Sequence, residues 1–390
     1  MNRSLRLARV VTTPFTFSTL LYDQIAAIRE SGIEVTLISS EVEHLSQIAH
    51  AQRVKYHCIP MVRRPDMLQD LRSLFALTRF LSANPFDIVH SNTPKAGLLT
   101  ALAGAISGTS LRLHTYTGQR WATLTGIRRQ VLRSFDSLIA KLCTETYADS
   151  VSQRKFLIDE NIVSHDKISV LGAGSISGVN LERFDPGRWG GQTRKDTRNQ
   201  LGIPQDAVVI AFVGRVTRDK GIVELIESFN GLRDRYPDLY LLLIGPFEPH
   251  LDPVPNATQS FIKEDERILG LGYSSKPEKY LGASDIFCLP SYREGFGSVV
   301  IEAGAMGLPS VATSIVGLMD AVEDGETGLL VPPRDSQALS EALEVLIKQP
   351  ELCSAMGTAA REYVMNNFDA DMINQAVVKE YFRLAQEHLP

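Results

Sequence analysis

Short apolar runs alternate with amphipathic stretches along the whole chain. The runs have the length and the β-branched content of buried strands. In the first half they cover residues 7–13, 33–40, 55–60, 87–92, 111–116, 146–152 and 168–172. The segment 19–32 between the first two has a helical period and ends at Ser31-Gly32, a common helix end. Strands that alternate with helices predict a parallel, doubly wound sheet.

The second half repeats this alternation. Its apolar runs cover residues 208–214, 239–245, 267–272, 286–290, 309–313 and 328–332, and a long helical stretch ends at residues 369–386. A length of 390 residues favours two domains over one core. The Gly- and Pro-rich segment 172–194 is the predicted hinge. We therefore expect an α/β protein with domains at 1–180 and 181–370, followed by a terminal helix at 371–390.

Composition is that of a soluble globular protein, with 44% hydrophobic and 22% charged residues. The four cysteines are scattered and lack the spacing of a metal site, which predicts reduced thiols in a cytoplasmic protein: Cys58, Cys143, Cys288 and Cys353. The apolar part of the N-terminus is brief and broken by Arg6 and Arg9, which favours a first strand over a signal peptide. No run approaches the roughly 20 apolar residues of a membrane span.

Charge is distributed unevenly. Residues 1–184 carry 21 Lys and Arg against 15 Asp and Glu, whereas the remaining residues carry 19 against 30. Within residues 51–141 the balance is 13 basic against 4 acidic. The first half is therefore a candidate for contact with an anionic surface.

The segment 293–313 (REGFGSVVIEAGAMGLPSVAT) holds the most specific chemistry. Glu294 opens a glycine-bearing loop, and Glu302 lies inside a short predicted helix. Gly295 and Gly297 allow close approach of the backbone to a ligand, and the turn into Ser298 exposes unpaired N–H groups at a helix N-terminus. Two carboxylates beside an anion-binding loop suit a ligand with hydroxyl and phosphate groups, such as a nucleotide sugar.

A second motif lies in residues 208–229. An apolar strand leads into a Gly-Arg turn, a basic loop and an amphipathic helix, with Arg215 and Lys220 on the loop. Open α/β sheets bind ligands at such loops. Arginine presents a planar fork to phosphate oxygens, and lysine presents a mobile point charge.

The spacing of Glu294 and Glu302 resembles the E-x7-E motif of the retaining glycosyltransferases of family four, and the Arg215–Lys220 loop agrees with it. The resemblance implies a GT-B fold, with two doubly wound Rossmann-like domains facing across a cleft and a C-terminal helix that crosses back onto the N-terminal domain. It also implies a UDP-sugar donor held without a metal or cofactor. Arg215 and Lys220 would hold the diphosphate, Glu294 would face the sugar and Glu302 the ribose.

The resemblance extends to further donor-site residues. Backbone N–H groups of Phe296, Gly297 and Ser298 would bind sugar or phosphate. Tyr273, in the loop 272–280, would border the nucleobase, although this loop is equally typical of a surface turn. His114 ends the strand 111–116, where family members place a histidine beside the transferred sugar; a strand-end histidine is otherwise more often structural.

The N-terminal half supplies the acceptor candidates. The stretch HSNTPKAG resembles that of polysaccharide-assembly transferases that act on polyprenyl-diphosphate-linked sugars, which makes Lys95 and His90 candidate ligands of the acceptor. The loop after the first strand, with Thr13 and Phe15, has no glycine and would shape the acceptor pocket or touch lipid. Arg120 follows in a segment that also resembles these enzymes. Each of these residues has a plain alternative as packed or surface structure.

Two basic amphipathic segments, 63–81 and 119–141, combine arginines with Leu, Phe and, in the second, Trp121. Such segments are typical of contact with a membrane surface. The alternative is a packed helix with a solvated basic face. Similar charge could meet nucleic acid, but no reader motif accompanies it.

We therefore expect a retaining, metal-independent transferase that moves an N-acetylhexosamine or related hexose from a UDP-sugar to a polyprenyl-diphosphate-linked glycan. Its place would be the cytoplasmic face of the inner membrane, in the synthesis of capsule, O-antigen, lipopolysaccharide or exopolysaccharide. A GDP-sugar transferase and a nucleotide-sugar epimerase or hydrolase of the same fold stay open, as does a protein that binds the donor without turnover.

Overall fold

The computed structural model describes residues 4–62, 64, 66–248 and 252–389. The chain forms two compact units. One unit holds the chain up to Gly178 together with everything from Ala370 onward, and the other holds Val179–Asp369. The unit boundary at Gly178 lies inside the predicted hinge 172–194, but the end of that segment is already helical in the second unit.

The first unit is built on a parallel sheet whose described strands number seven, in the order β3-β2-β1-β4-β5-β6-β7. The strands are β1 Arg6–Val10, β2 Glu34–Ser39, β3 Lys55–Cys58, β4 Ile88–Ser91, β5 Leu111–Tyr116, β6 Glu145–Ala148 and β7 Ile168–Val170. The predicted strand 146–152 is too long. It ends at Ala148 because the Ser150 side chain accepts from Gln153 N at 3.1 Å and caps a helix.

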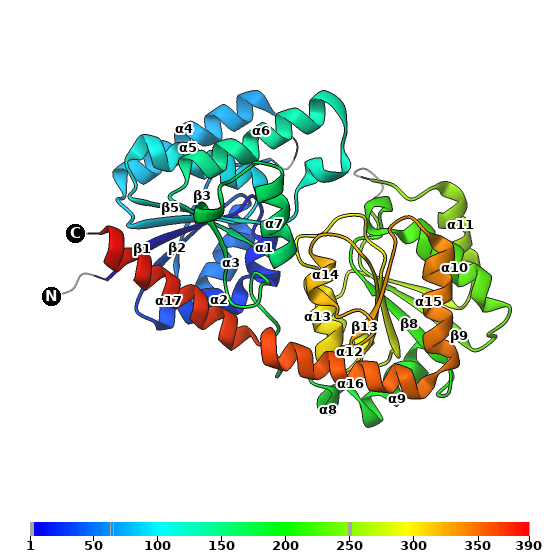
Figure 1. The fold of residues 1–390 in the computed structure, drawn as a ribbon. Coiled ribbons are helices and arrows are strands. Elements are labelled where there is room, and N and C mark those ends of the chain that lie inside the picture. The colour runs from blue at the N-terminus through cyan, green and yellow to red at the C-terminus, as the bar shows by residue number, and fades with distance from the viewer. Residues whose placement is uncertain (1–3, 63, 65, 249–251, 390) are drawn as a thin grey trace. The chain divides into compact units, whose positions relative to one another are not determined.

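Helices cover both faces of this sheet (Figure 1). On one face α4, α5 and α6 lie side by side, and on the other α17 packs against α2. The α-helices are α1 Phe15–Thr19, α2 Tyr22–Glu30, α3 Val42–Gln52, α4 Met67–Ala83, α5 Pro94–Ser107, α6 Gly126–Leu142, α7 Val151–Asp159 and α17 Ala370–His388, with 3-10 turns η1 Arg120–Thr123 and η2 His165–Lys167. Buried side chains on both faces form the core.

The C-terminal helix α17 is joined to the sheet by a buried polar cluster. Arg9 Nη1 donates to Tyr381 Oη at 2.5 Å, and Tyr381 Oη lies 2.7 Å from His90 Nδ1. Arg9 is 1% exposed, and among the described residues no carboxylate pairs with it. A buried charge without a counter-charge is costly unless its hydrogen bonds are satisfied, so these polar contacts determine where α17 packs.

The second unit repeats the architecture with a parallel sheet that has six described strands, in the order β10-β9-β8-β11-β12-β13. The strands are β8 Val208–Val213, β9 Leu239–Ile244, β10 Ile268–Gly272, β11 Ile286–Leu289, β12 Ser310–Thr313 and β13 Gly328–Val331. The direction of strand order reverses between β8 and β11. Ligands of doubly wound sheets bind outside the carboxyl ends of the strands at such a reversal.

The helices of the second unit are short around the sheet ends and long on its flanks. They are α8 Pro186–Trp189, α9 Gly191–Leu201, α10 Ile222–Arg233, α11 Asn256–Glu264, α12 Pro277–Leu281, α13 Ser298–Ala305, α14 Leu318–Ala321, α15 Ser336–Lys348 and α16 Pro350–Asn367, with the 3-10 turn η3 Arg218–Lys220. The two predicted α/β domains are therefore present, and in each the sheet is parallel.

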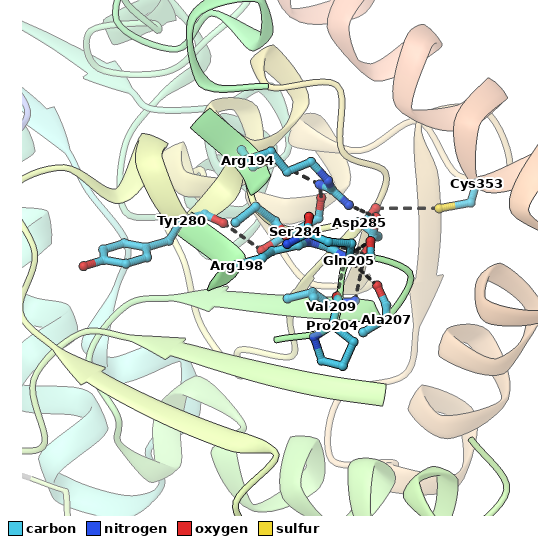
Figure 2. A network of polar contacts seen from close by, with 12 residues as sticks. Arg194, Arg198, Pro204, Gln205, Ala207, Val209, Tyr280, Ser284, Asp285 and Cys353 are labelled. Atoms are coloured by element: carbon cyan, nitrogen blue, oxygen red, sulfur yellow. Dashed lines mark hydrogen bonds and ion pairs between the residues drawn. The ribbon is translucent and has the colours of Figure 1, made fainter. Parts of the chain in front are cut away.

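Asp285 organises the amino-terminal end of the second sheet (Figure 2). Its carboxylate accepts from Arg194 Nη2 at 2.5 Å, Arg198 Nη2 at 2.8 Å and the backbone N–H of Val209 at 2.8 Å. Arg198, 1% exposed, also donates to the carbonyls of Ala283, Gln205 and Ala207. Asp285 therefore joins α9 to the starts of β8 and β11 and has a structural role.

The cysteines are all free thiols. Burial raises the pKa of Cys143 to about 12 and that of Cys353 to about 11, so these thiols are protonated at neutral pH. Among the described residues, no helix combines the length and the apolar character that crossing a membrane requires.

Candidate active site

The strand reversal of the second unit brings the two sequence motifs together. β8 leads into the loop with Arg215 and Lys220, and β11, its neighbour in the sheet, leads into the loop with Glu294. The two loops approach closely at Gly221, since a Cβ atom there would lie 1.9 Å from the carbonyl oxygen of Pro290. Segments some eighty residues apart in sequence thus form one surface at the carboxyl ends of the strands.

An ion pair joins the motifs. Lys220 Nζ donates to Glu294 Oε1. Both side chains are mostly buried, with 17% of Lys220 and 14% of Glu294 exposed. Partial burial strengthens the attraction between the two charges relative to a pair in water. The pair places a cation and a hydrogen-bond acceptor next to each other, as a site for a phosphate and a sugar requires.

Arg215 is held by two carboxylates. Its Nη1 donates to Glu248 Oε2 at 3.0 Å, and its Nη2 lies 3.5 Å from Asp219 Oδ2. Asp219 Oδ2 also lies 3.5 Å from Nη2 of Arg293. Sequence reasoning missed Asp219, Glu248 and Arg293, although Asp219 and Arg293 directly precede Lys220 and Glu294.

The Glu294 loop ends at the N-terminus of α13. Gly297 adopts a left-handed conformation with φ of 86° as the residue before the helix, and Phe296 is buried with its ring 5.0 Å from that of Phe368. The buried ring anchors the loop, so the first helical residue, Ser298, follows directly from an anchored turn. This is the geometry of an anion-binding helix start.

Glu302 lies within α13 and is half-buried. No described residue is hydrogen-bonded to its carboxylate. Burial raises the pKa of Glu302 to about 7, with nearby Arg183 lowering it and Glu278 raising it. Glu278 and Arg183 form an ion pair at 2.9 Å, which sequence reasoning did not identify. A half-buried carboxylate with free acceptor capacity is suited to hydroxyl donors.

Tyr273 follows β10, the edge strand of the sheet, and its side chain is 60% exposed. Because β9 lies between β10 and β8, Tyr273 belongs to a different loop from the Arg215–Lys220 and Glu294 motifs. Its proposed contact with the nucleobase stays a prediction.

His114 lies near the carboxyl end of β5 in the first unit, paired in register with Ser91 of β4. Its Nδ1 lies 2.9 Å from Ser91 Oγ, and its ring contacts Tyr116 edge to face. Gly97 of α5 leaves room for the ring, because a Cβ atom there would lie 2.5 Å from His114 Cε1. Burial lowers the pKa of His114 to about 3, although a hydrogen bond to the Ser91 backbone acts to raise it. The imidazole is therefore neutral.

His90 differs from the acceptor-binding expectation. It is 2% exposed, with Nδ1 at 2.7 Å from Tyr381 Oη and Nε2 at 2.8 Å from Thr115 Oγ1. Burial first, then the positive charge of Arg9 and the electrostatic interaction with the neighbouring His114 ring, lower the pKa of His90 well below its usual value. Both ring nitrogens are engaged inside the unit, so in this structure His90 has no free nitrogen to offer an acceptor and acts as a structural residue.

Lys95 lies in the first turn of α5, as expected, but its charge is already paired. Its Nζ donates to Asp70 Oδ1 at 2.6 Å and to the carbonyl oxygen of Arg64 at 2.7 Å. An acceptor diphosphate would therefore compete with Asp70 for this ammonium group. The sequence alone does not reveal this pairing, because Asp70 belongs to a different helix.

The remaining acceptor candidates follow β1 and β5. Thr13 is half-buried, and Phe15, 49% exposed, opens the helix α1 where a loop was expected. Arg120 is exposed at the start of η1, and no described residue pairs with it. These residues stay predictions as acceptor ligands.

The two amphipathic segments differ in their details from the sequence reading. Trp121 is buried, not available to a membrane: its Nε1 donates to Asp136 Oδ2 at 2.6 Å and its ring stacks on Phe156. The segment 119–141 is divided between η1 and α6. Arg129 and Arg133 both pair with Glu160, and Arg63 lies outside the described residues.

The exposed apolar side chains of the two segments lie mainly on α4 and α6. On α4 they are Met67 at 80%, Leu68 at 72%, Leu71 at 57% and Phe75 at 70%, and on and before α6 they are Leu124 at 37%, Ile127 at 84%, Val131 at 44% and Phe135 at 41%. Together we call these residues the α4/α6 apolar surface.

Comparison with known proteins identifies the class. Residues 193–363 match the model of "Glycosyl transferases group 1", and residues 18–174 match that of the "Glycosyl transferase 4-like domain". The chain belongs to glycosyltransferase family four and has the GT-B fold. It is therefore a glycosyltransferase, as the motifs at Glu294 and Arg215 indicated. The described residues contain no group of three or more His, Cys, Asp or Glu side chains able to hold a metal.

Individual relatives refine the picture. The chain is 32% identical over 369 residues to the capsular polysaccharide biosynthesis glycosyltransferase CapM of Staphylococcus aureus, covering 94% of each chain. It is 26% identical to an Escherichia coli UDP-Gal:alpha-D-GlcNAc-diphosphoundecaprenol alpha-1,3-galactosyltransferase, covering 86% of this chain and 85% of that one. The structure of Anabaena Alr3699/HepE in complex with UDP and glucose shares the fold, with a TM-score of 0.79 at 18% identity, covering 97% and 100% of the two chains.

Proposed function

We propose that this protein is a retaining glycosyltransferase of polysaccharide synthesis. It moves an N-acetylhexosamine or related hexose from a UDP-sugar to a glycan linked to polyprenyl diphosphate. The names of two relatives support the proposal, one a capsular polysaccharide enzyme and the other a galactosyltransferase that acts on a diphosphoundecaprenol-linked sugar. A related fold holding UDP supports the donor class.

The observation that carries the proposal is the Lys220–Glu294 pair beside Arg215 at the β8/β11 reversal. When the bond between the sugar C1 and the phosphate oxygen breaks, its electron pair leaves with the diphosphate. Arg215 and Lys220 stabilise that charge, and the N-terminus of α13 adds a partial positive charge. Glu294 accepts from sugar hydroxyls and Glu302 from the ribose. These protein cations supply the charge that a metal ion would otherwise provide, so the proposal requires no metal.

The acceptor step completes the transfer. The acceptor hydroxyl oxygen bonds to C1 from the face that the diphosphate leaves, and its proton passes to a departing phosphate oxygen. His114 is neutral, so it donates or accepts a hydrogen bond beside the sugar without adding charge. The acceptor diphosphate is assigned to Lys95, where it replaces Asp70.

The test is release of nucleoside diphosphate from UDP-, GDP- and ADP-sugars, with and without a synthetic polyprenyl-diphosphate sugar. The expected result is release from a UDP-sugar that rises with the lipid acceptor, together with a product that keeps the anomeric configuration of the donor. Release of GDP from a GDP-sugar would show that the donor nucleotide is GDP and not UDP. Turnover indifferent to acceptor supports the epimerase or hydrolase alternative, and no turnover with any donor refutes the proposal.

Variants connect the activity to the site. Lys220→Met and Glu294→Gln each remove one partner of the ion pair, and we expect kcat to fall by about 10²–10³ because charge stabilisation in the transition state is lost. Lys348→Met is the matched control, since Lys348 lies on α15, pairs with Glu344 and is 59% exposed. A Glu294→Gln enzyme with full transfer activity would refute the assignment of the site.

The proposal includes peripheral attachment to the cytoplasmic face of the inner membrane, where a polyprenyl-linked acceptor resides. The α4/α6 apolar surface, with exposed Arg64, Arg72, Arg79, Arg120 and Arg128 on or beside the same segments, supports it. Exposed apolar side chains with exposed arginines on the same segments are suited to a surface of anionic lipid.

Co-sedimentation with vesicles of phosphatidylglycerol and phosphatidylcholine tests this attachment. We expect binding at low salt that weakens as salt is raised and that Phe75→Asp reduces by about tenfold, because burial of a phenyl ring contributes about 1.5–3 kcal/mol. Met365→Asp, at an exposed apolar position of α16, is the control. If the wild-type protein does not bind these vesicles at low salt, the proposed attachment is refuted, whereas the proposed transfer reaction is not.

A further inference from the structure

Asp219 joins three segments around the donor site. Its Oδ1 accepts from Thr217 Oγ1 at 2.6 Å, which fixes the side chain within its own loop. Its backbone N–H donates to Asp252 Oδ2 at 2.6 Å, and its carbonyl accepts from the N–H of Tyr292 at 2.9 Å. The residue is therefore immobilised by its own loop, by the segment after β9 and by the segment that leads into Glu294.

The second carboxylate oxygen of Asp219 faces two arginines. Nη2 of Arg215 and Nη2 of Arg293 each lie 3.5 Å from Oδ2. At this distance the attraction is mainly between whole charges, since directed hydrogen bonds are shorter. One carboxylate thus brings two arginines from different loops to the same place.

The carboxylate is ionised at neutral pH. Burial acts to raise the pKa of Asp219, but the Thr217 hydrogen bond and the charges of Arg215, Lys220 and Arg293 lower it below its usual value. The other carboxylates nearby each pair with one cation: Glu294 pairs with Lys220, and Glu248 pairs with Arg215 at 3.0 Å. Of these three carboxylates, Asp219 lies beside two arginines at once.

We infer that Asp219 is a positioning residue for the donor diphosphate: it holds Arg215 and Arg293 side by side, with Arg293 as a further phosphate-binding cation next to Glu294. This inference rests on the proposed function. Preorganised charges stabilise a developing anion better than charges that must first move into place. Removal of the Asp219 carboxylate removes a charge that repels the donor diphosphate, but it also releases both arginines. Weaker UDP binding would therefore indicate a positioning role, and tighter binding would indicate repulsion.

The experiment compares UDP binding and turnover in wild type, Asp219→Asn and Asp219→Glu. The amide of Asp219→Asn matches the carboxylate in size and still accepts from Thr217, but it carries no charge. We expect calorimetry to show UDP bound about tenfold more weakly, and kcat to fall by a larger factor than KM rises. Asp219→Glu restores part of the loss. Asp238→Asn, at an exposed position directly before β9, is the control.

A double-mutant cycle separates positioning from general disruption. If Asp219 acts through its two arginines, the effect of Asp219→Asn on UDP affinity shrinks in an Arg215→Met background and falls to less than about twofold when Arg293→Met is added. Tighter UDP binding by Asp219→Asn would show that the carboxylate merely repels the donor and would overturn the inference. So would unchanged binding, or a loss fully explained by a fall in the unfolding temperature. Failure of wild type to bind or turn over any nucleotide or nucleotide sugar refutes the proposed donor site, and this inference with it.

Discussion

Replacement of Asp285 by Asn tests the polar network at the base of the second sheet. The carboxylate faces Arg194, which is 28% exposed, and Arg198, which is 1% exposed. The amide leaves one acceptor oxygen for three donors and leaves Arg198 without its counter-charge. Breaking a fully buried pair costs about 3–5 kcal/mol. Because 30% of the Asp285 side chain is exposed, solvent screening reduces this, and we expect a loss of about 2–3 kcal/mol.

The assay is thermal unfolding followed by calorimetry. For a unit of this size about 1 kcal/mol shifts the midpoint by about 2–4 °C, so the transition of the second unit should fall by about 4–12 °C. Asp234→Asn is the control, because Asp234 is 81% exposed beside Arg233 and should shift the midpoint by less than about 2 °C. If Asp285→Asn unfolded within 2 °C of wild type, Arg198 would be satisfied by its carbonyl partners alone, and the reasoning would be wrong.

Three further changes test other parts of the molecule. The pKa of Glu302 is about 7 in the folded protein against an ordinary 4.5, so ionisation of Glu302 destabilises the fold as pH rises between these values. In calorimetric scans, Glu302→Gln should unfold at a higher temperature than wild type above pH 7. Below about pH 4.5 the two proteins should unfold at the same temperature. Tyr381→Phe leaves buried Arg9 short of an acceptor and should cost about 1–3 kcal/mol in urea unfolding, whereas an unchanged midpoint would mean that α17 docks by apolar packing alone. Gly97→Ala places a methyl group 2.5 Å from Cε1 of the buried His114 ring, which must then shift. We expect about tenfold lower kcat/KM and a stability loss of up to about 2 kcal/mol, because the helix propensity gained, about 1 kcal/mol, offsets only part of the overpacking. Kinetics equal to those of wild type would argue against a role for that ring.

Much of the fold was predictable because its signals are local. The thirteen apolar runs correspond to the thirteen described strands. A strand buried on both faces must be apolar throughout, whereas the edge strand β3 is exposed or half-buried and carries Lys55. The run 146–152 was extended too far because Ser150 was read as strand when it caps a helix. The loop expected at Phe15 is the helix α1, whose preceding residue, Pro14, makes no side-chain cap.

The sequence by itself determined the strands, the parallel α/β class and the positions of Glu294, Glu302, Arg215 and Lys220, because strand periodicity and glycine-bearing turns are properties of neighbouring residues. Only the tertiary structure decided which charges meet. The adjacency of β8 and β11 pairs Lys220 with Glu294 and brings Asp219 to Arg293.

The same holds for the residues that sequence reasoning misplaced. His90 is engaged by Tyr381, which lies 291 positions away, and Trp121 is buried against Asp136 across a break between η1 and α6. An exposed and a buried aromatic residue look alike in a sequence, because burial depends on which distant elements cover the side chain, and only the folded chain brings those elements together.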